Sequence, residues 1–161
     1  MTSKRLGRQT VRLGSPVSVL SYANIGGKQE AQGPLAGYFD ELNQDAYFGQ
    51  KSWEKGESAM QQFALRRAME KGGLIPEDLD YVLAGDLLNQ CIGTSFSLRD
   101  FKIPFYGLYG ACSTMGESLS LAALLIDGGF ASIVAAMTSS HFCTAERQYR
   151  MPVLYGNQRT P

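Results

Sequence analysis

The residue with the clearest potential for chemistry is Cys112, which lies in the small-residue segment Gly-Ala-Cys-Ser-Thr at positions 110–114. A stretch typical of a short strand precedes this segment, and a stretch typical of a helix follows it. The partial positive charge at a helix N-terminus lowers the pKa of a thiol and favours its nucleophilic thiolate. The pattern predicts either an acyl-accepting nucleophile or the lining of a ligand site beside Ser113, and the alternative is a small buried apolar residue.

His141 is the second candidate, and it is the only histidine of the chain. It follows an apolar stretch at residues 132–137 that is typical of a buried strand. Ligands gather at the carboxyl ends of the strands in parallel α/β sheets. Because Cys112 and His141 both follow predicted strands, they could share one crevice; the alternative is a structural histidine.

Two arginines and one aspartate complete the set of candidate ligand-binding residues. Arg147 and Arg150 lie in a polar stretch that could fold over the crevice and hold a carboxylate through two hydrogen bonds. The alternative is a solvated charged loop. Asp86 directly follows the apolar stretch at residues 81–84, so it could line the crevice or cap a helix.

The elements that would position these residues alternate along the chain. Strand-like stretches lie at residues 16–21, 81–84, 103–108 and 132–137, and helix-like stretches at residues 57–71, within 87–100, and from 114 to 127. This alternation predicts an α/β fold with a mostly parallel sheet. In residues 57–71 we place Met60, Phe63, Ala64 and Ala68 on the inward face and Gln61 outside.

The helix that follows Cys112 has almost no polar face. Residues 118–126 carry no charge, which predicts a helix buried on all sides in the middle of a folded body. The apolar run is too short to span a membrane, which takes about 20 residues. Residues 138–161 show no regular element, and residues 1–14 are expected to be loosely held. We expect a single truncated domain over residues 1–161, or one half of a larger protein.

Composition excludes several classes of function. The formal net charge is zero, which argues against non-specific nucleic-acid binding. The three cysteines include no C-x-x-C pair, which argues against a disulfide framework or a zinc site. We expect no cofactor and no metal, and no secretory signal or membrane-spanning segment is visible.

Five segments together resemble the stage V sporulation protein AD family, which belongs to the thiolase-like superfamily with the ketoacyl synthases. They are AGDLLNQ at residues 84–90, GACST at 110–114, IDGGFA at 126–131, TSSH at 138–141 and TAERQ at 144–148. The resemblance implies a layered thiolase-like fold of two similar halves, with helices between two sheets. This chain would be the N-terminal half, with a mostly parallel sheet and a buried central helix.

The resemblance also implies a function. Family members are expected to bind dipicolinic acid, to help load it into the developing spore with membrane proteins of the same sporulation group, and to lie at the spore inner membrane. Thiolase-like relatives are usually homodimers. The second half, with the histidine and asparagine that such enzymes use beside the cysteine, is absent. A half fold should also expose a face meant for its twin.

Three hypotheses of function follow. The first is a non-catalytic protein that binds dipicolinate near Cys112, with Ser113, His141, Arg147, Arg150 and Asp86 as its candidate partners. The second is a scaffold that docks membrane partners. The third is a cysteine-dependent acyltransferase of the thiolase type, with Cys112 as the covalent acceptor.

Overall fold

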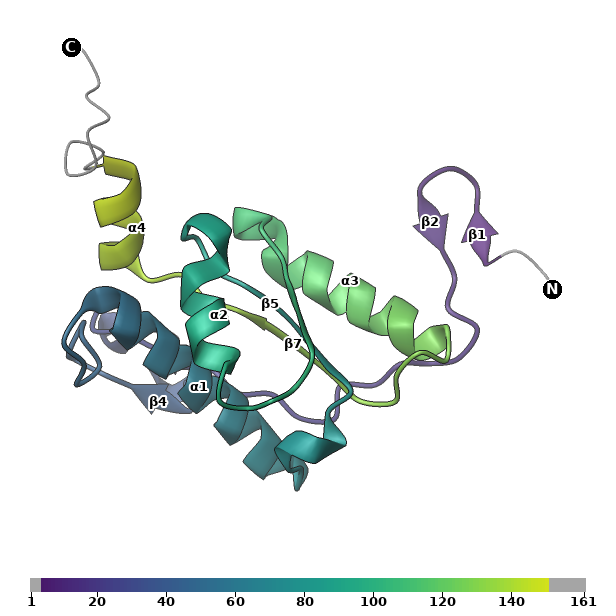
Figure 1. Ribbon diagram of the computed structural model, residues 1–161, viewed down its shortest axis with the longest axis horizontal. Helices are drawn as coiled ribbons and strands as arrows, with labels where there is room; N and C mark the ends of the chain where they lie inside the picture. Colours follow the sequence, from purple (N-terminus) through teal and green to yellow (C-terminus); the bar gives the residue numbers. More distant parts are fainter. Residues whose placement is uncertain (1–3, 151–161) are drawn as a thin grey trace, which may run out of the picture.

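The computed structural model describes residues 4–150 of the 161-residue chain, without the side chain of Arg150. The helices are α1 (Trp53–Gly72), α2 (Ile92–Leu98), α3 (Thr114–Asp127) and α4 (Phe142–Arg150). The strands are β1 (Arg5–Leu6), β2 (Thr10–Val11), β3 (Ile25–Gly26), β4 (Glu41–Leu42), β5 (Tyr81–Gly85), β6 (Phe105–Gly107) and β7 (Val134–Thr138). Figure 1 shows their arrangement.

The main sheet has three parallel strands in the order β6-β5-β7. Val82 of the central strand lies opposite Phe105 on one side and opposite Ala135 on the other. The helices α2 and α3 supply the crossovers that parallel neighbours need. The predicted α/β fold with a parallel sheet is therefore confirmed.

Two apolar cores lie on opposite faces of this sheet, because successive side chains of a strand point to opposite faces. Val82 and Ala84 of β5 pack with Leu65 and Met69 of α1 in the larger core. Leu83, between them, packs with Leu108 and with Ala122 of α3 in the smaller core. In Figure 1, α1 and α3 accordingly lie on opposite sides of β5 and β7.

The predicted helix at residues 57–71 is confirmed as part of α1. Ser52 accepts a hydrogen bond from the backbone N–H of Lys55 at its start, and Gly73 ends it in the left-handed conformation at φ 66°. The placement of Gln61 on its outer face was wrong. The buried positions include Glu57, Gln61, Leu65 and Met69, at intervals of four residues, so that Gln61 points inward. Polar residues can occupy a buried face when their hydrogen bonds are satisfied there.

The prediction that α3 is buried on all sides is wrong. Its buried positions are Thr114, Ser118 and Ala122, whereas Leu119 and Leu124 are 48% and 45% exposed. The three-stranded sheet covers one side of α3 and leaves the opposite apolar side uncovered. The expectation of an exposed apolar face is confirmed. The expectation that this face belongs against a second half stays a prediction.

Two further predictions of secondary structure are wrong. Residues 16–21 form no strand, and Val19 is 74% exposed, because alternation alone cannot supply the neighbouring strand that a ladder needs. The stretch from residue 138 contains the helix α4, which starts after His141. Residues 151–161 lie outside the described part of the chain.

An antiparallel hairpin of β1 and β2 lies at the far end of α3 from α4 (Figure 1). The Lys4 ammonium group contacts the Asp127 carboxylate at 2.7 Å, and the backbone N–H of Gly14 donates to the same carboxylate. The hydrogen bond from Lys4 is the main reason why the pKa of Asp127 is lowered. The expectation that residues 1–14 are loosely held stays a prediction.

Gly85 at the end of β5 offers a test of this packing. A Cβ atom at this position would lie 2.0 Å from the Leu108 carbonyl oxygen and 2.9 Å from the Thr114 methyl group. We expect Gly85→Ala to lower the free energy of unfolding by about 1–3 kcal/mol, because it forces the β5 and β6 ends apart. Urea denaturation measures this change.

Gly116→Ala is the matched control, because a Cβ atom there meets nothing within 4 Å. It should stabilise α3 by roughly 0.5–1 kcal/mol, since alanine is the better helix former. Equal stability of the two variants would contradict the close approach at Gly85.

Candidate functional site

The three parallel strands bring the candidate residues to one edge of the sheet. Asp86 follows β5 directly, Cys112 follows β6 after a short loop, and His141 lies three residues beyond β7. Figure 1 shows the α2, α3 and α4 ends at this carboxyl edge. Because β5 lies between β6 and β7, the strands that lead to Cys112 and His141 are two strand spacings apart, about 10 Å.

Cys112 is exposed and lies in a single 3₁₀ turn, Ala111–Ser113, immediately before α3. Ala111 adopts φ 49°, a left-handed conformation that is uncommon for residues other than glycine. The Ser113 hydroxyl group donates to the Gly110 carbonyl oxygen at 2.8 Å, so Ser113 stabilises the turn. Strained backbone of this kind clusters at functional sites. The geometry leaves the Cys112 thiol open to solvent beside a helix N-terminus.

His141 is largely buried and caps α4. Its Nε2 lies 2.8 Å from the Ala46 carbonyl oxygen, and its Nδ1 accepts from the backbone N–H of Thr144 at 3.4 Å. A carbonyl oxygen only accepts, so the Nε2–H group of His141 donates to Ala46. Both nitrogen atoms are therefore occupied by structural contacts.

Asp86 is 1% exposed and organises the start of α2. Its carboxylate accepts from the Leu88 backbone at 2.8 Å, and from the backbone N–H and hydroxyl group of Thr94 at 2.7 and 2.6 Å. These contacts match the predicted alternative of a helix cap, because Thr94 lies in the first turn of α2.

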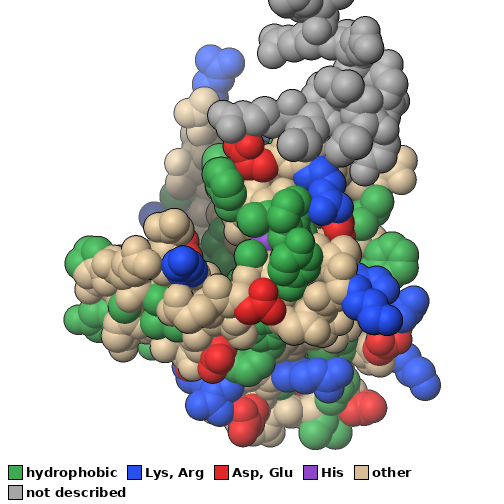
Figure 2. All heavy atoms as spheres, turned by 90° about the vertical axis from the view of Figure 1, so that its left-hand side faces the viewer, with side chains coloured by type: hydrophobic (Ala, Val, Ile, Leu, Met, Phe, Trp, Pro, Cys, Tyr) green, Lys and Arg blue, Asp and Glu red, His purple; other side chains and the backbone are tan. Residues whose placement is uncertain are grey.

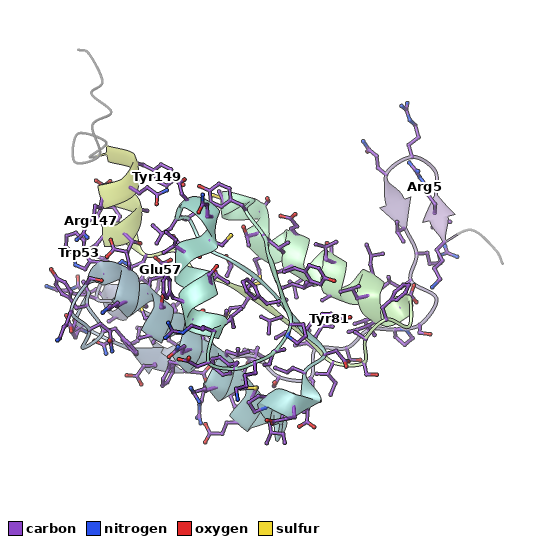
Figure 3. All side chains as sticks on the ribbon, viewed as in Figure 1. Arg5, Trp53, Glu57, Tyr81, Arg147 and Tyr149 are labelled. Atoms are coloured by element: carbon purple, nitrogen blue, oxygen red, sulfur yellow. The ribbon has the colours of Figure 1, made fainter. Side chains whose placement is uncertain are left out.

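Arg147 of α4 contacts the start of α1. Its guanidinium group donates to Glu54 at 2.9 Å and lies 4.4 Å from the ring centroid of Trp53. Figure 3 shows Arg147 and Trp53 side by side where the two helices meet. Arg150 belongs to the same helix, but its side chain lies outside the described part of the structure.

Glu57 is a site residue that the sequence analysis did not identify. It is 1% exposed, and its two carboxyl oxygens lie 2.6 Å from the hydroxyl groups of Ser139 and Thr144. The Gln61 amide donates to Ser139 at 2.6 Å and to Thr94 at 3.3 Å, which extends the network to Asp86. The pKa of Glu57 is raised, first because of burial and further because of the Asp86 charge. One feature of the sequence could have indicated that Glu57 points inward: it lies at four-residue spacing with Gln61 and the apolar Leu65, on one face of the helix.

A tyrosine pair, also missed, joins α4 to the loops beside Cys112. The hydroxyl groups of Tyr149 and Tyr109 lie 2.8 Å apart, and Tyr149 also donates to the Leu87 carbonyl oxygen. The hydrogen bond with Tyr109 and partial burial raise the pKa of Tyr149 to about 12. Tyr109 lies three residues before Cys112, so α4 and the cysteine turn are physically connected.

A cavity of about 1020 Å³ lies between α1, α3, β7 and residues 16–25. Its walls are mainly apolar, and Glu57, Gln61, Ser139, Ser140 and His141 form a polar end. Of the candidate residues, His141 lines this cavity, whereas the residues described as its lining do not include Cys112, Ser113, Asp86 or Arg147. On the face of the molecule seen in Figure 2, hydrophobic side chains gather at the centre and charged ones surround them.

This chain is similar to known proteins in structure and in sequence. One similar solved structure is the priming β-ketosynthase from the R1128 polyketide biosynthetic pathway, with a TM-score of 0.45 and 21% identity over 53% of this chain and 27% of that chain. The Stage V sporulation protein AD of Bacillus subtilis (strain 168) is 43% identical over 156 residues, 97% of this chain. That alignment covers 46% of the relative, so the chain spans about half its length. Residues 7–161 also match the family described as Stage V sporulation protein AD, and the chain therefore belongs to that family.

Proposed function

We propose that the chain is part of a sporulation protein that binds dipicolinic acid and takes part in its uptake into the developing spore. The observation that carries the proposal is the family match over residues 7–161. Dipicolinate is a flat aromatic ring with two carboxylates, so its site needs N–H donors or cations. We place the ligand at the carboxyl edge of the sheet, near Cys112.

The local chemistry of this edge supports a dicarboxylate. The N-terminal turn of α3 offers backbone N–H groups and a partial positive charge beside Cys112 and Ser113. The hydroxyl groups of Tyr109 and Tyr149 stand on the neighbouring loop and on α4. Arg147 supplies a cation on α4, and a ligand carboxylate takes the place of Glu54 on its guanidinium group.

Titration calorimetry with dipicolinate tests this assignment. We expect the protein to bind the ligand and Arg147→Ala to weaken binding about ten-fold or more, because a hydrogen bond to a charged group is lost. Cys112→Ala should also weaken binding, since the thiol lies on the floor of the site. Arg99→Ala is the matched control, because Arg99 is exposed and pairs with Asp100 at the opposite end of α2.

Isophthalate, which has the same two carboxylates without the ring nitrogen, measures how much the pyridine contributes. The absence of heat with dipicolinate would contradict the proposed function. Equal affinity of Arg147→Ala and Arg99→Ala would contradict the placement of the ligand beside α4.

Acyl transfer is the second candidate, and the exposure of Cys112 at the start of α3 favours it. In such a step the Cys112 thiolate attacks the carbonyl carbon of an acyl thioester, a new thioester forms, and the thiol of the donor leaves. We rank this candidate below ligand binding, because the family match over residues 7–161 supports the binding proposal.

Mass spectrometry after incubation with acyl-CoA decides between the two. Acyl transfer predicts an acyl group on Cys112 and none on Cys91, whose thiol is buried, donates to the Leu108 carbonyl oxygen and has a raised pKa because of that burial. The binding proposal predicts no acyl group on Cys112. Equal modification of Cys112 and the half-buried Cys143 would indicate non-specific labelling and would count against acyl transfer.

A scaffold that docks membrane proteins of the same sporulation group is the remaining candidate. The uncovered apolar side of α3, with Met115, Leu119 and Leu124 exposed, favours a docking role. In the described part of the chain, the helices are too short or too polar to cross a bilayer. Retention of the membrane partners by a Cys112→Ala variant that no longer binds ligand would favour the scaffold.

A further inference from the structure

The Glu57 carboxyl group lies where three parts of the chain meet. It comes from the first turns of α1, and its hydrogen-bond partners are Ser139, just after β7, and Thr144, in the first turn of α4. These partners are 82 and 87 residues away in the sequence. Glu57 is 1% exposed, and Figure 3 shows it between α1 and the start of α4. The protonation state of a buried carboxyl group in this position decides whether its hydrogen bonds hold α1, β7 and α4 together.

The hydrogen atoms available around Glu57 indicate its protonation state. The Thr144 hydroxyl group has one hydrogen but two oxygen neighbours, Glu57 Oε2 at 2.6 Å and the His141 carbonyl oxygen at 2.8 Å. If Glu57 were ionised, Thr144 would donate to the carboxylate, and the contact with the His141 carbonyl would join two lone pairs without a hydrogen. A neutral Glu57 donates to Thr144, which then donates to His141, so that each contact has a hydrogen.

The other half of the network agrees with this assignment. Ser139 accepts from the Gln61 amide at 2.6 Å, which leaves its single hydrogen for Glu57 Oε1. A neutral carboxylic acid offers one accepting and one donating oxygen, as these two neighbours require.

Two titratable groups in the described part of the chain, Asp86 and His141, face Glu57 and act on its pKa in opposite directions. Asp86, at the end of β5, is a second buried acid that disfavours a negative charge on Glu57. His141, before α4, lowers the pKa of Glu57, and this effect is smaller than the opposite effect of Asp86. On the same helix, Glu54 is paired with Arg147 of α4. The helix α2 carries no charged side chain in its sequence IGTSFSL.

We propose that Glu57 is a positioning residue which, as a neutral carboxylic acid, donates a hydrogen bond to Thr144 and so holds the start of α4 against α1 and the end of β7. The helix carries Arg147, which contacts Trp53, and Tyr149, which contacts Tyr109 near Cys112. Loss of the Glu57 proton therefore loosens α4 and its side chains at the carboxyl edge. This inference stands independently of the ligand proposed above.

The pH dependence of stability tests the protonation state. The folded protein keeps a proton that the unfolded chain releases above the ordinary glutamate pKa of about 4.5. From about pH 5 upwards, until Glu57 ionises in the folded protein, the unfolding equilibrium constant of the wild type should therefore rise relative to Glu57→Gln by about ten-fold per pH unit. Urea denaturation across this range measures the difference.

Glu57→Gln suits this comparison because its amide keeps one donor and one acceptor in the same place without a titrating group. The control is Glu70→Gln on the same helix, since Glu70 is exposed and pairs with Arg67. We expect Glu70→Gln to keep the pH dependence of the wild type. Identical pH dependence of the wild type and Glu57→Gln would overturn the proposal.

The fluorescence of Trp53, the only tryptophan of the chain, reports the position of α4 because Arg147 lies over its ring. Arg147→Ala provides the signal of a tryptophan without this contact. Glu57→Ala should show that signal, and Glu57→Gln should show the wild-type signal. A folded Glu57→Ala variant with wild-type emission would overturn the positioning role. If this variant does not fold, the pH dependence of unfolding of the wild type and Glu57→Gln still tests the protonated state on which the proposal rests.

Discussion

The hydrogen bonds of the Glu57 carboxyl group hold the functional edge of this fold together. They connect α1 to the end of β7 and to the first turn of α4, and Gln61 extends the connection through Thr94 to Asp86. A buried polar network of this kind stabilises one arrangement strongly when all its members are satisfied, and it is costly when one partner is lost. The position of α4, and with it the contact between Tyr149 and Tyr109, depends on these bonds.

The sheet supplies the frame in which this network can form. The central strand β5 is paired on both sides, and its alternating side chains enter the two apolar cores. The parallel direction of the strands then places Asp86, the Cys112 turn and His141 at the same edge. Asp86 and His141 use their polar atoms to cap α2 and α4, whereas Cys112 is exposed at the same edge.

The parts of the fold that follow from local patterns were predictable. The helices α1 and α3 and the strands β5 and β7 have clear periodicity or apolar runs, and the strand-end rule placed the candidate residues on one edge. The face of α1 was not predictable, because Glu57 and Gln61 look like surface residues until their partners 33 to 87 residues away are known. The helix α4 was missed because its nine residues are mostly polar and its start depends on the His141 side chain.

The exposed side of α3 shows the same limit. Its uncharged sequence indicates burial, but what covers a helix is decided by the rest of the molecule. In this chain, which spans about half the length of the relative from Bacillus subtilis, the sheet covers only one side. The local sequence therefore predicted the helix and its apolar character correctly, and it could not predict which side remains open.

The protonation state of Glu57 is the most direct test of the account. Carboxyl carbon chemical shifts in the NMR spectrum distinguish a carboxylic acid from a carboxylate, and Glu57→Gln identifies the signal. We expect the Glu57 signal to remain that of the protonated acid above the ordinary glutamate pKa of about 4.5. A Glu57 signal that titrates at or below this ordinary value would contradict the proposed protonation state.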